Sequence, residues 1–471
     1  MRGGIRHAPA TFHRDQDTRR RPRSGDLPEE DIMPTQPSTH APSLASRTDA
    51  HTSHDSRTQR YLQLLLLVIA AGTIYPMLYL RQVYQPTMLQ FFRIDDVQLG
   101  YLYSSLGTIF LVSYLPSGWL ADRLSPRRLI CFSLLATGAL GFVYATGPSF
   151  PALVLIFGGW GLTTGLTFWA AVIKRVNTIA GPDEQGRFFG LLDGGRGLVE
   201  ALLATIAITL FAYVTQTRGG ADAAGFRLVV NLYAFCCIAL GVLLALVKEP
   251  ARKSERPATS RHQRNVLTDL KTLAAIPELW LVAAIVFCGY QVFWATFSFS
   301  AYLHEGNFGL SVTAAGFITT LKLWMRPIGG IGGGYLGDRV SKVTVLFWAL
   351  VLAALSLVGL IAAPPHSPQA MLVVLVLFIG VLTYAVRGLY WSLLDDCRVP
   401  PHCAGLAIGL ISVLGYSPDV FVPLINGYVT QTWPGAHGYQ LYFGYIAAIA
   451  LCGAGAAAVL KYRLNRMKES A

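Results

Sequence analysis

The chain has 471 residues, of which 53% are apolar and only 14% are charged, and its formal net charge is +12. Since about a quarter of the residues of ordinary soluble proteins are charged, this composition excludes such a protein and predicts a polytopic membrane protein. The positive charge does not indicate nucleic-acid binding, because most bases lie in short loops between apolar runs. The seven cysteines lack the spacing of metal ligands, which favours buried free thiols.

The N-terminal segment, residues 1–58, is rich in Pro, Ser, Thr, His and Arg and has no apolar periodicity. Such a segment cannot bury enough apolar surface to offset the entropy lost on ordering, so we expect a disordered tail. It also lacks the apolar core of a secretory signal peptide. Its basic cluster, residues 19–23, has two interpretations, a solvated tail or a contact with anionic lipid headgroups.

Twelve long apolar runs follow this tail. A helix of about 20 residues crosses a hydrocarbon core of about 30 Å, and such a run must be helical because the core holds no water to satisfy its backbone groups. The sequence therefore predicts an all-α fold with twelve transmembrane helices. The predicted spans are residues 61–91, 97–120, 128–147, 151–174, 187–213, 226–248, 278–303, 312–336, 342–363, 369–394, 403–430 and 438–461.

The bases of the loops are distributed unevenly between the two sides of the membrane. If the first span enters from the cytoplasm, the opposite side holds little beyond Arg93, Arg218 and Arg227. Loop bases are enriched on the cytoplasmic side, so this distribution predicts that both termini are cytoplasmic. The predicted segments are a cytoplasmic tail 1–58, an N-terminal six-helix half 59–248, a cytoplasmic linker 249–277, a C-terminal six-helix half 278–463 and a cytoplasmic tail 464–471.

A motif of glycine, turn residues and charges, Gly118 to Arg128, lies between the second and third spans. Between the eighth and ninth spans, Gly334 to Lys342 repeats its order of glycine, aromatic residue, leucine, small residue, Asp-Arg, apolar residue and serine. Two copies at matching places predict two related halves. The motif residues are Gly118, Asp122, Arg123 and Arg127 in the first copy and Gly334, Asp338 and Arg339 in the second.

The twelve spans, the central basic linker and the doubled Gly-x-x-x-Asp-Arg motif resemble the major facilitator superfamily over residues 60–463. The resemblance implies a secondary transporter whose pseudo-symmetric halves rock around a central site, built mainly by the first, fourth, seventh and tenth helices. It also implies that Asp122 and Arg123 form a cytoplasmic gate latch, since a paired carboxylate stabilises one packing of the halves. The alternative, an ordinary positive loop, does not require the doubled Asp-Arg.

A finer resemblance concerns the first span, where Tyr-Leu-Arg81 and the later Leu-Gly100 look like the organophosphate:phosphate antiporter branch, which includes sugar-phosphate permeases. It implies that Arg81 contacts a phosphate. The chain departs from that branch, because Tyr114 stands where a base is expected in the second helix and the seventh span has no base. The seventh span offers instead Tyr290, Gln291 and Trp294.

Several charges lie inside the predicted spans, where each costs on the order of 3 kcal/mol and therefore needs a partner or an aqueous cavity. Arg81 lies within the first span, although an arginine snorkelling to the outer headgroups remains an alternative. Lys322 and Arg326 are four residues apart and share a helix face. Their counter-ion is either a substrate anion or a protein acid such as Asp419. Arg387 lies in the tenth span, on a helix that lines the cavity in the family.

In the fifth span, Asp193, Arg196 and Glu200 are spaced to neutralise one another as a ladder along one helix. Alternatively, Glu200 and Asp419 are proton-coupling residues, because burial favours the neutral acid that carries a proton. Aromatic residues on the cavity helices either pack against neighbours or form pocket walls. The predicted substrate contacts are Arg81, Tyr84, Tyr114, Trp169, Tyr290, Gln291, Trp294, Lys322, Arg387 and Tyr390.

These observations predict a secondary active transporter of a small anionic solute, a sugar phosphate or another organic acid, coupled to protons or a counter-solute. The anionic preference rests on Arg81, Lys322 and Arg387, which outnumber Glu200 and Asp419. The alternatives are proton-driven efflux of apolar or cationic compounds and a membrane sensor or scaffold that transports nothing. No nucleophile–base set indicates an enzyme. We expect a monomer in the inner membrane whose partners are the solute and the lipid bilayer, without cofactor, metal or nucleic acid.

Overall fold

The computed structural model describes residues 44–180, 184–217, 219–247, 266–306, 308–397, 399–400 and 403–469. The chain divides into two compact units, residues 1–55 and residues 56–471, and the second unit holds all the predicted spans. The predicted disordered tail up to residue 43 and most of the predicted linker, residues 248–265, lie outside the described residues.

The described residues form helices and no strand. The N-terminal half contains α1 (Leu44–Leu78), α2 (Arg81–Phe92), α3 (Asp96–Arg123), α4 (Pro126–Tyr144), α5 (Phe150–Gly161), α6 (Trp169–Ile179), α7 (Gln185–Ala212) and α8 (Asp222–Leu246). After α9 (Val266–Ala274), the C-terminal half contains α10 (Pro277–Ala295), η3 (Thr296–Ser298), α11 (Phe299–Glu305), α12 (Val312–Leu323), α13 (Met325–Arg339), α14 (Lys342–Ile361), α15 (Gln369–Leu389), η4 (Tyr390–Cys397), α16 (Ala404–Gly415), α17 (Pro418–Thr432) and α18 (Ala436–Glu469).

Helices occupy all twelve predicted spans, and within the described residues ten are long and apolar enough to cross a membrane. The other two are α3 and the pair α12 and α13, which are rich in glycine and polar side chains. The prediction of an all-α polytopic fold is therefore confirmed. The two largest differences from the predicted boundaries are that α1 begins at Leu44, inside the predicted tail, and that α18 continues to Glu469. Extending an existing helix requires no new nucleus, so helices easily run past the apolar segment.

Several spans are interrupted near their middle. The break between α1 and α2 lies at Tyr79 and Leu80, between Pro76 and Pro86, and Pro418 begins α17 directly after the break that ends α16. Proline lacks the backbone N–H that continues a helix. Irregular backbone inside a membrane is tolerated only where protein buries it or where it lines a cavity, so these breaks indicate that the spans are buried in protein or line a cavity there.

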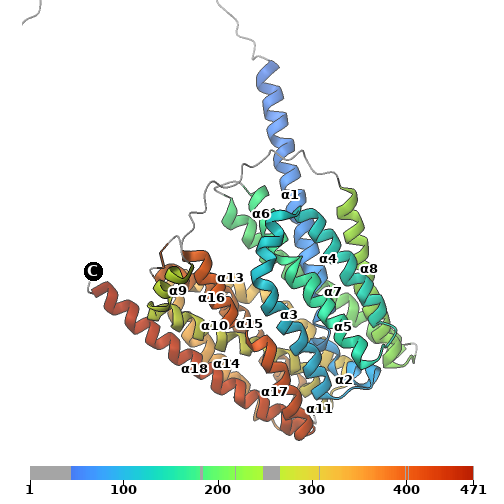
Figure 1. Ribbon diagram of the computed structural model, residues 1–471. Coiled ribbons are helices and arrows are strands. Elements are labelled where there is room, and N and C mark those ends of the chain that lie inside the picture. The colour runs from blue at the N-terminus through green and yellow to red at the C-terminus, as the bar shows by residue number, and fades with distance from the viewer. Residues whose placement is uncertain are drawn as a thin grey trace, which may run out of the picture. The chain divides into compact units, whose positions relative to one another are not determined.

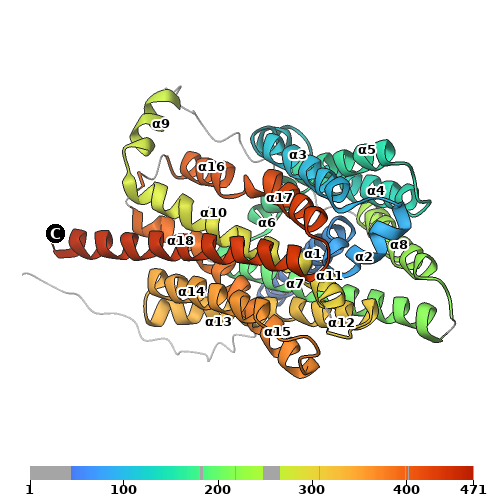
Figure 2. The ribbon, with the colours of Figure 1, turned by 90° about the horizontal axis from the view of Figure 1, so that it is seen from below.

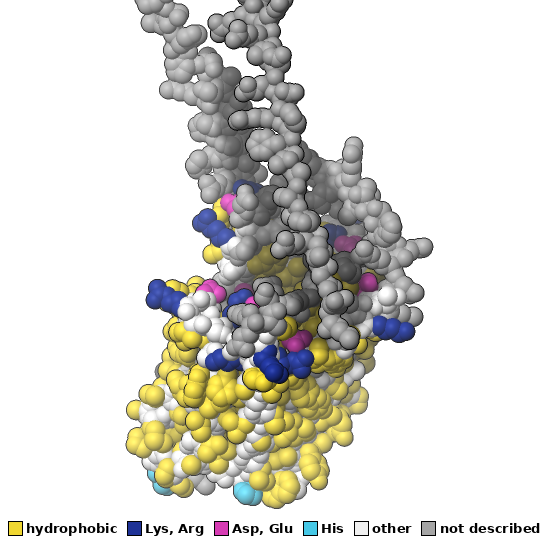
Figure 3. Space-filling model, turned by 90° about the vertical axis from the view of Figure 1, so that its left-hand side faces the viewer, with side chains coloured by type: hydrophobic (Ala, Val, Ile, Leu, Met, Phe, Trp, Pro, Cys, Tyr) yellow, Lys and Arg dark blue, Asp and Glu magenta, His cyan; other side chains and the backbone are white. Residues whose placement is uncertain are grey.

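The outer surface of the helices is apolar. Large side chains such as Leu155 and Ile331 are 76% and 72% exposed, as expected for residues that face lipid. On the face drawn in Figure 3, apolar side chains cover the lower part, and the described Lys and Arg side chains gather towards one end. This distribution fits a protein embedded in a bilayer with a basic surface at one side.

The two halves lie side by side (Figure 2) and approach closely where α3 runs along α17 (Figure 1). A Cβ atom on Gly100 would lie 2.6 Å from the carbonyl oxygen of Pro423. A Cβ atom on Gly107 would overlap the carbonyl oxygen of Asp419, and one on Gly427 would overlap that of Asp96. Only glycine permits this approach. The contact begins at the end of α3 that we predict to be outside the cell, so the halves are closed there.

We expect Gly427→Ala to lower the melting temperature of the purified protein by several degrees, because overpacking costs about 1–3 kcal/mol. The measurement is thermal unfolding in detergent. Gly444→Ala on α18 is the matched control, since an added Cβ there meets no atom within 4 Å. Equal melting temperatures for both variants would contradict a close contact between α3 and α17.

Candidate functional site

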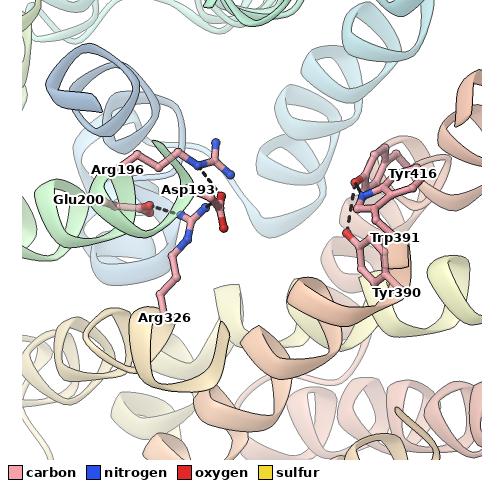
Figure 4. Close-up of polar contacts among 7 residues, drawn as sticks. All are labelled: Asp193, Arg196, Glu200, Arg326, Tyr390, Trp391 and Tyr416. Carbon is pink, nitrogen blue, oxygen red and sulfur yellow. Dashed lines mark hydrogen bonds and ion pairs between the residues drawn. The ribbon is translucent and has the colours of Figure 1, made fainter. Parts of the chain in front are cut away.

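A cluster of four charges joins the halves between α7 and α13 (Figure 4). Arg326 donates from Nη1 to Glu200 Oε2 at 2.8 Å and from Nη2 to Asp193 Oδ1 at 3.2 Å. Arg196 Nε donates to the same Asp193 oxygen at 3.0 Å, and its guanidinium lies 4.7 Å from the ring centre of Trp169. The predicted pair of Asp193 and Arg196 is present, but Glu200 binds Arg326 instead of completing the ladder.

Lys322, four residues before Arg326, does not share its counter-ions. The side chain is fully buried, and its Nζ donates to Gln82 Oε1 and to Thr296 Oγ1, both at 2.9 Å. Gly380 leaves room for the lysine stem, because a Cβ there would lie 2.7 Å from Lys322 Cγ. Within the described part of the chain, no carboxylate is bonded to this ammonium group.

Arg387 is a half-buried cation on α15 that is held by aromatic rings. Its guanidinium carbon lies 4.0 Å from the ring centre of Phe293 and 5.6 Å from that of Tyr290. A cation over a ring face is stabilised by the ring quadrupole but keeps its hydrogen-bond donors. Among the described residues, no carboxylate forms an ion pair with Arg387, so its donors remain available to an anion.

Arg81 lies directly after the break between α1 and α2 and is 1% exposed, so it does not extend to the lipid headgroups. Its Nε donates to Gln85 Oε1 at 3.0 Å, and its Nη2 donates to Asn426 Oδ1 of α17. Gln85 in turn donates to Asp96 Oδ1 at 2.9 Å. In this conformation, therefore, Arg81 connects the two halves rather than lining an open cavity.

Three predicted aromatic contacts gather around Tyr416, which the sequence analysis did not select. Tyr390 Oη lies 3.1 Å from Tyr416 Oη, and Trp391 Nε1 donates to the same hydroxyl at 3.2 Å (Figure 4). The rings of Tyr290 and Tyr114 have their centres 4.7 Å and 6.1 Å from that of Tyr416. This group forms an aromatic wall with several hydroxyls, and it faces the ion-pair cluster in Figure 4.

Other predicted residues have different surroundings. Asp419 is buried and accepts a hydrogen bond from Trp294 Nε1 at 2.8 Å. Gln291 accepts from Tyr445 Oη of α18 at 2.7 Å. Tyr84 packs against Phe211 and Phe226 inside the N-terminal half, apart from the other predicted contacts.

The two copies of the Asp-Arg motif have similar local structures. Arg123 stacks over Trp119 and Arg339 stacks over Tyr335, each at 4.3 Å from the ring centre. Asp122 Oδ1 pairs with Lys174 Nζ at 3.0 Å beside a cavity of about 480 Å³ between α3 and α6. Arg127 donates to the carbonyl oxygens of Leu244 and Ala245, at 2.9 and 2.7 Å. For the described residues, these motif contacts stay within one half, so the motif does not latch the halves together here.

Sequence reasoning missed the neutral partners Gln82, Thr296, Asn426 and Tyr416. A usable signal existed for Gln82 and Asn426, because an amide inside an apolar span needs a partner. The partners themselves lie far away in the chain: Arg81 and Asn426 are separated by 345 residues.

Long apolar helices in two halves, joined around a central region of buried charges, define a polytopic membrane transporter. The family model described as the Major Facilitator Superfamily matches residues 61–423. The chain therefore belongs to the major facilitator superfamily.

Two relatives and one solved structure illustrate the similarity. The inner membrane protein YqcE of Escherichia coli K12 is 29% identical, and the alignment covers 81% of this chain and 90% of YqcE. The probable galactarate/D-glucarate transporter GudP of Bacillus subtilis 168 is 23% identical, with 76% and 83% covered. A bacterial homolog of the human lysosomal transporter Spinster, solved in an inward-facing and unoccupied conformation, matches with a TM-score of 0.67 at 16% identity, covering 86% of this chain and 98% of that one.

We expect Arg326→Gln to destabilise the protein strongly, because removing one partner of a buried ion pair costs about 3–5 kcal/mol. The double variant Arg326→Gln/Glu200→Gln should recover most of the lost melting temperature, since no unpaired carboxylate remains at Glu200. Arg60→Gln is the control: Arg60 pairs with Glu184 at 3.1 Å, and the two side chains are 35% and 23% exposed, so the change should be smaller. Equal effects of the two single variants would contradict a largely buried pair of Arg326 and Glu200.

Proposed function

We propose that this protein is a secondary active transporter of small organic anions that carry carboxylates, of the sugar-acid type. The observation that carries the proposal is Arg387, a cation held by rings that forms no ion pair with any described carboxylate. A guanidinium presents paired donors that match the geometry of a carboxylate. The names of relatives such as GudP, a probable galactarate/D-glucarate transporter, support the same class of solute.

The charge balance of the central region supports an anion. Asp193 and Glu200 are neutralised by Arg196 and Arg326. Arg81, Lys322 and Arg387 remain, against the buried acid Asp419. The other buried acid among the described residues of the spans, Glu278, pairs with Arg463. An excess of positive charge in a region shielded from water favours binding of an anion.

The aromatic wall around Tyr416 fits the rest of such a solute. The phenols of Tyr390 and Tyr416 donate and accept hydrogen bonds, and the indole of Trp391 donates one. The hydroxyl groups of a sugar acid match the phenol O–H and indole N–H groups, and its C–H faces match the faces of the aromatic rings. We propose that this wall binds the polyol part while Arg387 binds the carboxylate.

Transport follows from alternating access in this proposal. Contacts of α2 and α3 with the C-terminal half close the side that we predict to be outside the cell, and the Asp-Arg motif leaves the opposite side unlatched. With both termini cytoplasmic, as the loop bases predict, this arrangement is an inward-facing state. Efflux of cations fits less well, because Glu200 is bound to Arg326 and Asp419 accepts from Trp294.

We expect Arg387→Gln to weaken binding of D-glucarate or galactarate by about 10- to 100-fold, because a hydrogen bond to a charged group contributes about 1.5–3 kcal/mol. Arg387→Lys should retain part of the binding. The measurements are ligand-dependent thermal stabilisation and uptake of the radiolabelled acids into proteoliposomes.

Arg466→Gln, an exposed arginine on α18, is the control and should behave like the wild type. Unchanged uptake by Arg387→Gln would refute the role of Arg387. A wild type that moves no organic acid would refute the proposed function and favour a sensor or scaffold.

A further inference from the structure

We infer that Lys322 is the proton-binding site of the transport cycle, the group that gains a proton when the organic anion binds and loses it when the anion leaves. This inference rests on the proposed function, and it replaces Glu200 and Asp419 as the site of coupling. It also changes the role of Lys322 from a substrate contact to a proton carrier.

Lys322 and Arg81 differ from the other described cations of the core, because both donate to neutral side-chain oxygens. Arg196 and Arg326 have carboxylate partners, and Arg387 has ring faces. The Lys322 ammonium is fully buried and contacts only the neutral oxygens of Gln82 and Thr296. An arginine keeps its charge in proteins, whereas a buried lysine is able to become neutral. Lys322 is therefore the core cation whose charge can change.

Few charged groups face Lys322 from the helices packed around α12. Glu200 of α7 and Arg387 of α15 are within electrostatic range, and Glu200 is already bound by Arg326 of α13. Arg81 of α2 is directed to Asn426. At the far end of α11, His304 Nδ1 lies 3.0 Å from the Leu310 carbonyl oxygen, and Glu305 accepts from Tyr439 at 3.4 Å. Among the residues that the structure describes, no acid therefore forms an ion pair with Lys322.

A bound anion supplies the missing charge. A carboxylate beside Arg387 places a negative charge within electrostatic range of Lys322 and favours the ammonium form over the amine. Linkage is reciprocal, so the protonated lysine strengthens binding of the anion by the same factor. When the anion leaves, the ammonium form loses this support and releases H⁺ to water, leaving the neutral amine. Anion and proton then cross the membrane together.

The hydrogen bond of Lys322 to Gln82 also depends on which side of the transporter is open. Lys322 belongs to the C-terminal half, and its partner Gln82 belongs to the N-terminal half. Opening the side that is closed in this structure must separate α2 from α12 and break this hydrogen bond. The ammonium group then meets water from that side, where it is able to exchange its proton.

The first test uses the purified wild-type protein in a weakly buffered detergent solution. D-glucarate is added at pH values from 5 to 9, and proton uptake is followed with a pH indicator. Uptake is expected at those pH values at which Lys322 is neutral before the anion binds. Lys322→Arg keeps the charge but does not titrate, so it should bind D-glucarate without proton uptake. Lys461→Arg, an exposed lysine on α18, is the matched control and should retain proton uptake.

The second test separates exchange from coupling in proteoliposomes. Lys322→Arg should exchange external for internal D-glucarate at a rate near that of the wild type, but it should not accumulate the acid in response to a pH gradient. Lys322→Gln should also lose accumulation, which provides a second variant if one fails to fold.

The outcomes are distinguishable. A wild type that neither binds nor exchanges D-glucarate or galactarate would overturn the proposed function itself. A wild type that binds the acid without proton uptake at any pH would overturn only the inference about Lys322, as would a Lys322→Arg variant that still takes up protons. Loss of both exchange and binding in a folded Lys322→Arg variant would assign Lys322 to anion binding instead.

Discussion

The structure depends on one constraint, that a charge buried away from water must find a partner inside the protein. Here those partners come largely from the opposite half. Arg326 binds two acids of α7, Lys322 binds Gln82 of α2, and Arg81 binds Asn426 of α17. Each bond ties a side chain of one six-helix half to the other half. The polar groups that make the centre suitable for a solute therefore also hold this conformation together.

Because the same polar groups hold the halves together and lie where a solute is proposed to bind, solute binding is able to shift the packing of the halves. The glycine contacts between α3 and α17 and the bonds of α2 close one side, while the Asp-Arg motifs bond only within their own halves among the described residues. An equilibrium between two packings shifts only by the difference in the ligand's interaction with each of them. In the proposed coupling, binding of the anion changes the charge of Lys322 and therefore its bond to Gln82 of the other half, which supplies the required differential interaction.

Much of the fold was predictable from the sequence, because a transmembrane span is encoded locally by a run of apolar residues. The Asp-Arg motifs and the pair of Asp193 and Arg196 are local as well. The partners of the remaining charges were not predictable: Arg326 lies 126 residues from Glu200 in the chain, and no periodicity connects them. The Tyr416 wall was missed for the same reason, since Tyr416 lies 26 residues from Tyr390 in the chain and no periodicity connects them.

The chemistry of the basic residues explains how the roles are divided among them. Arginine is permanently charged and forked, so it suits the positions where a charge must persist, in the ion-pair cluster and beside the solute. Lysine carries a compact charge that depends on its surroundings, and it occurs at the fully buried position between two neutral oxygens. An arginine at position 322 would keep its buried charge after the solute leaves, because arginine does not lose its proton in proteins. A lysine there makes the charge of the core depend on the presence of the anion, which is the physical requirement for coupling.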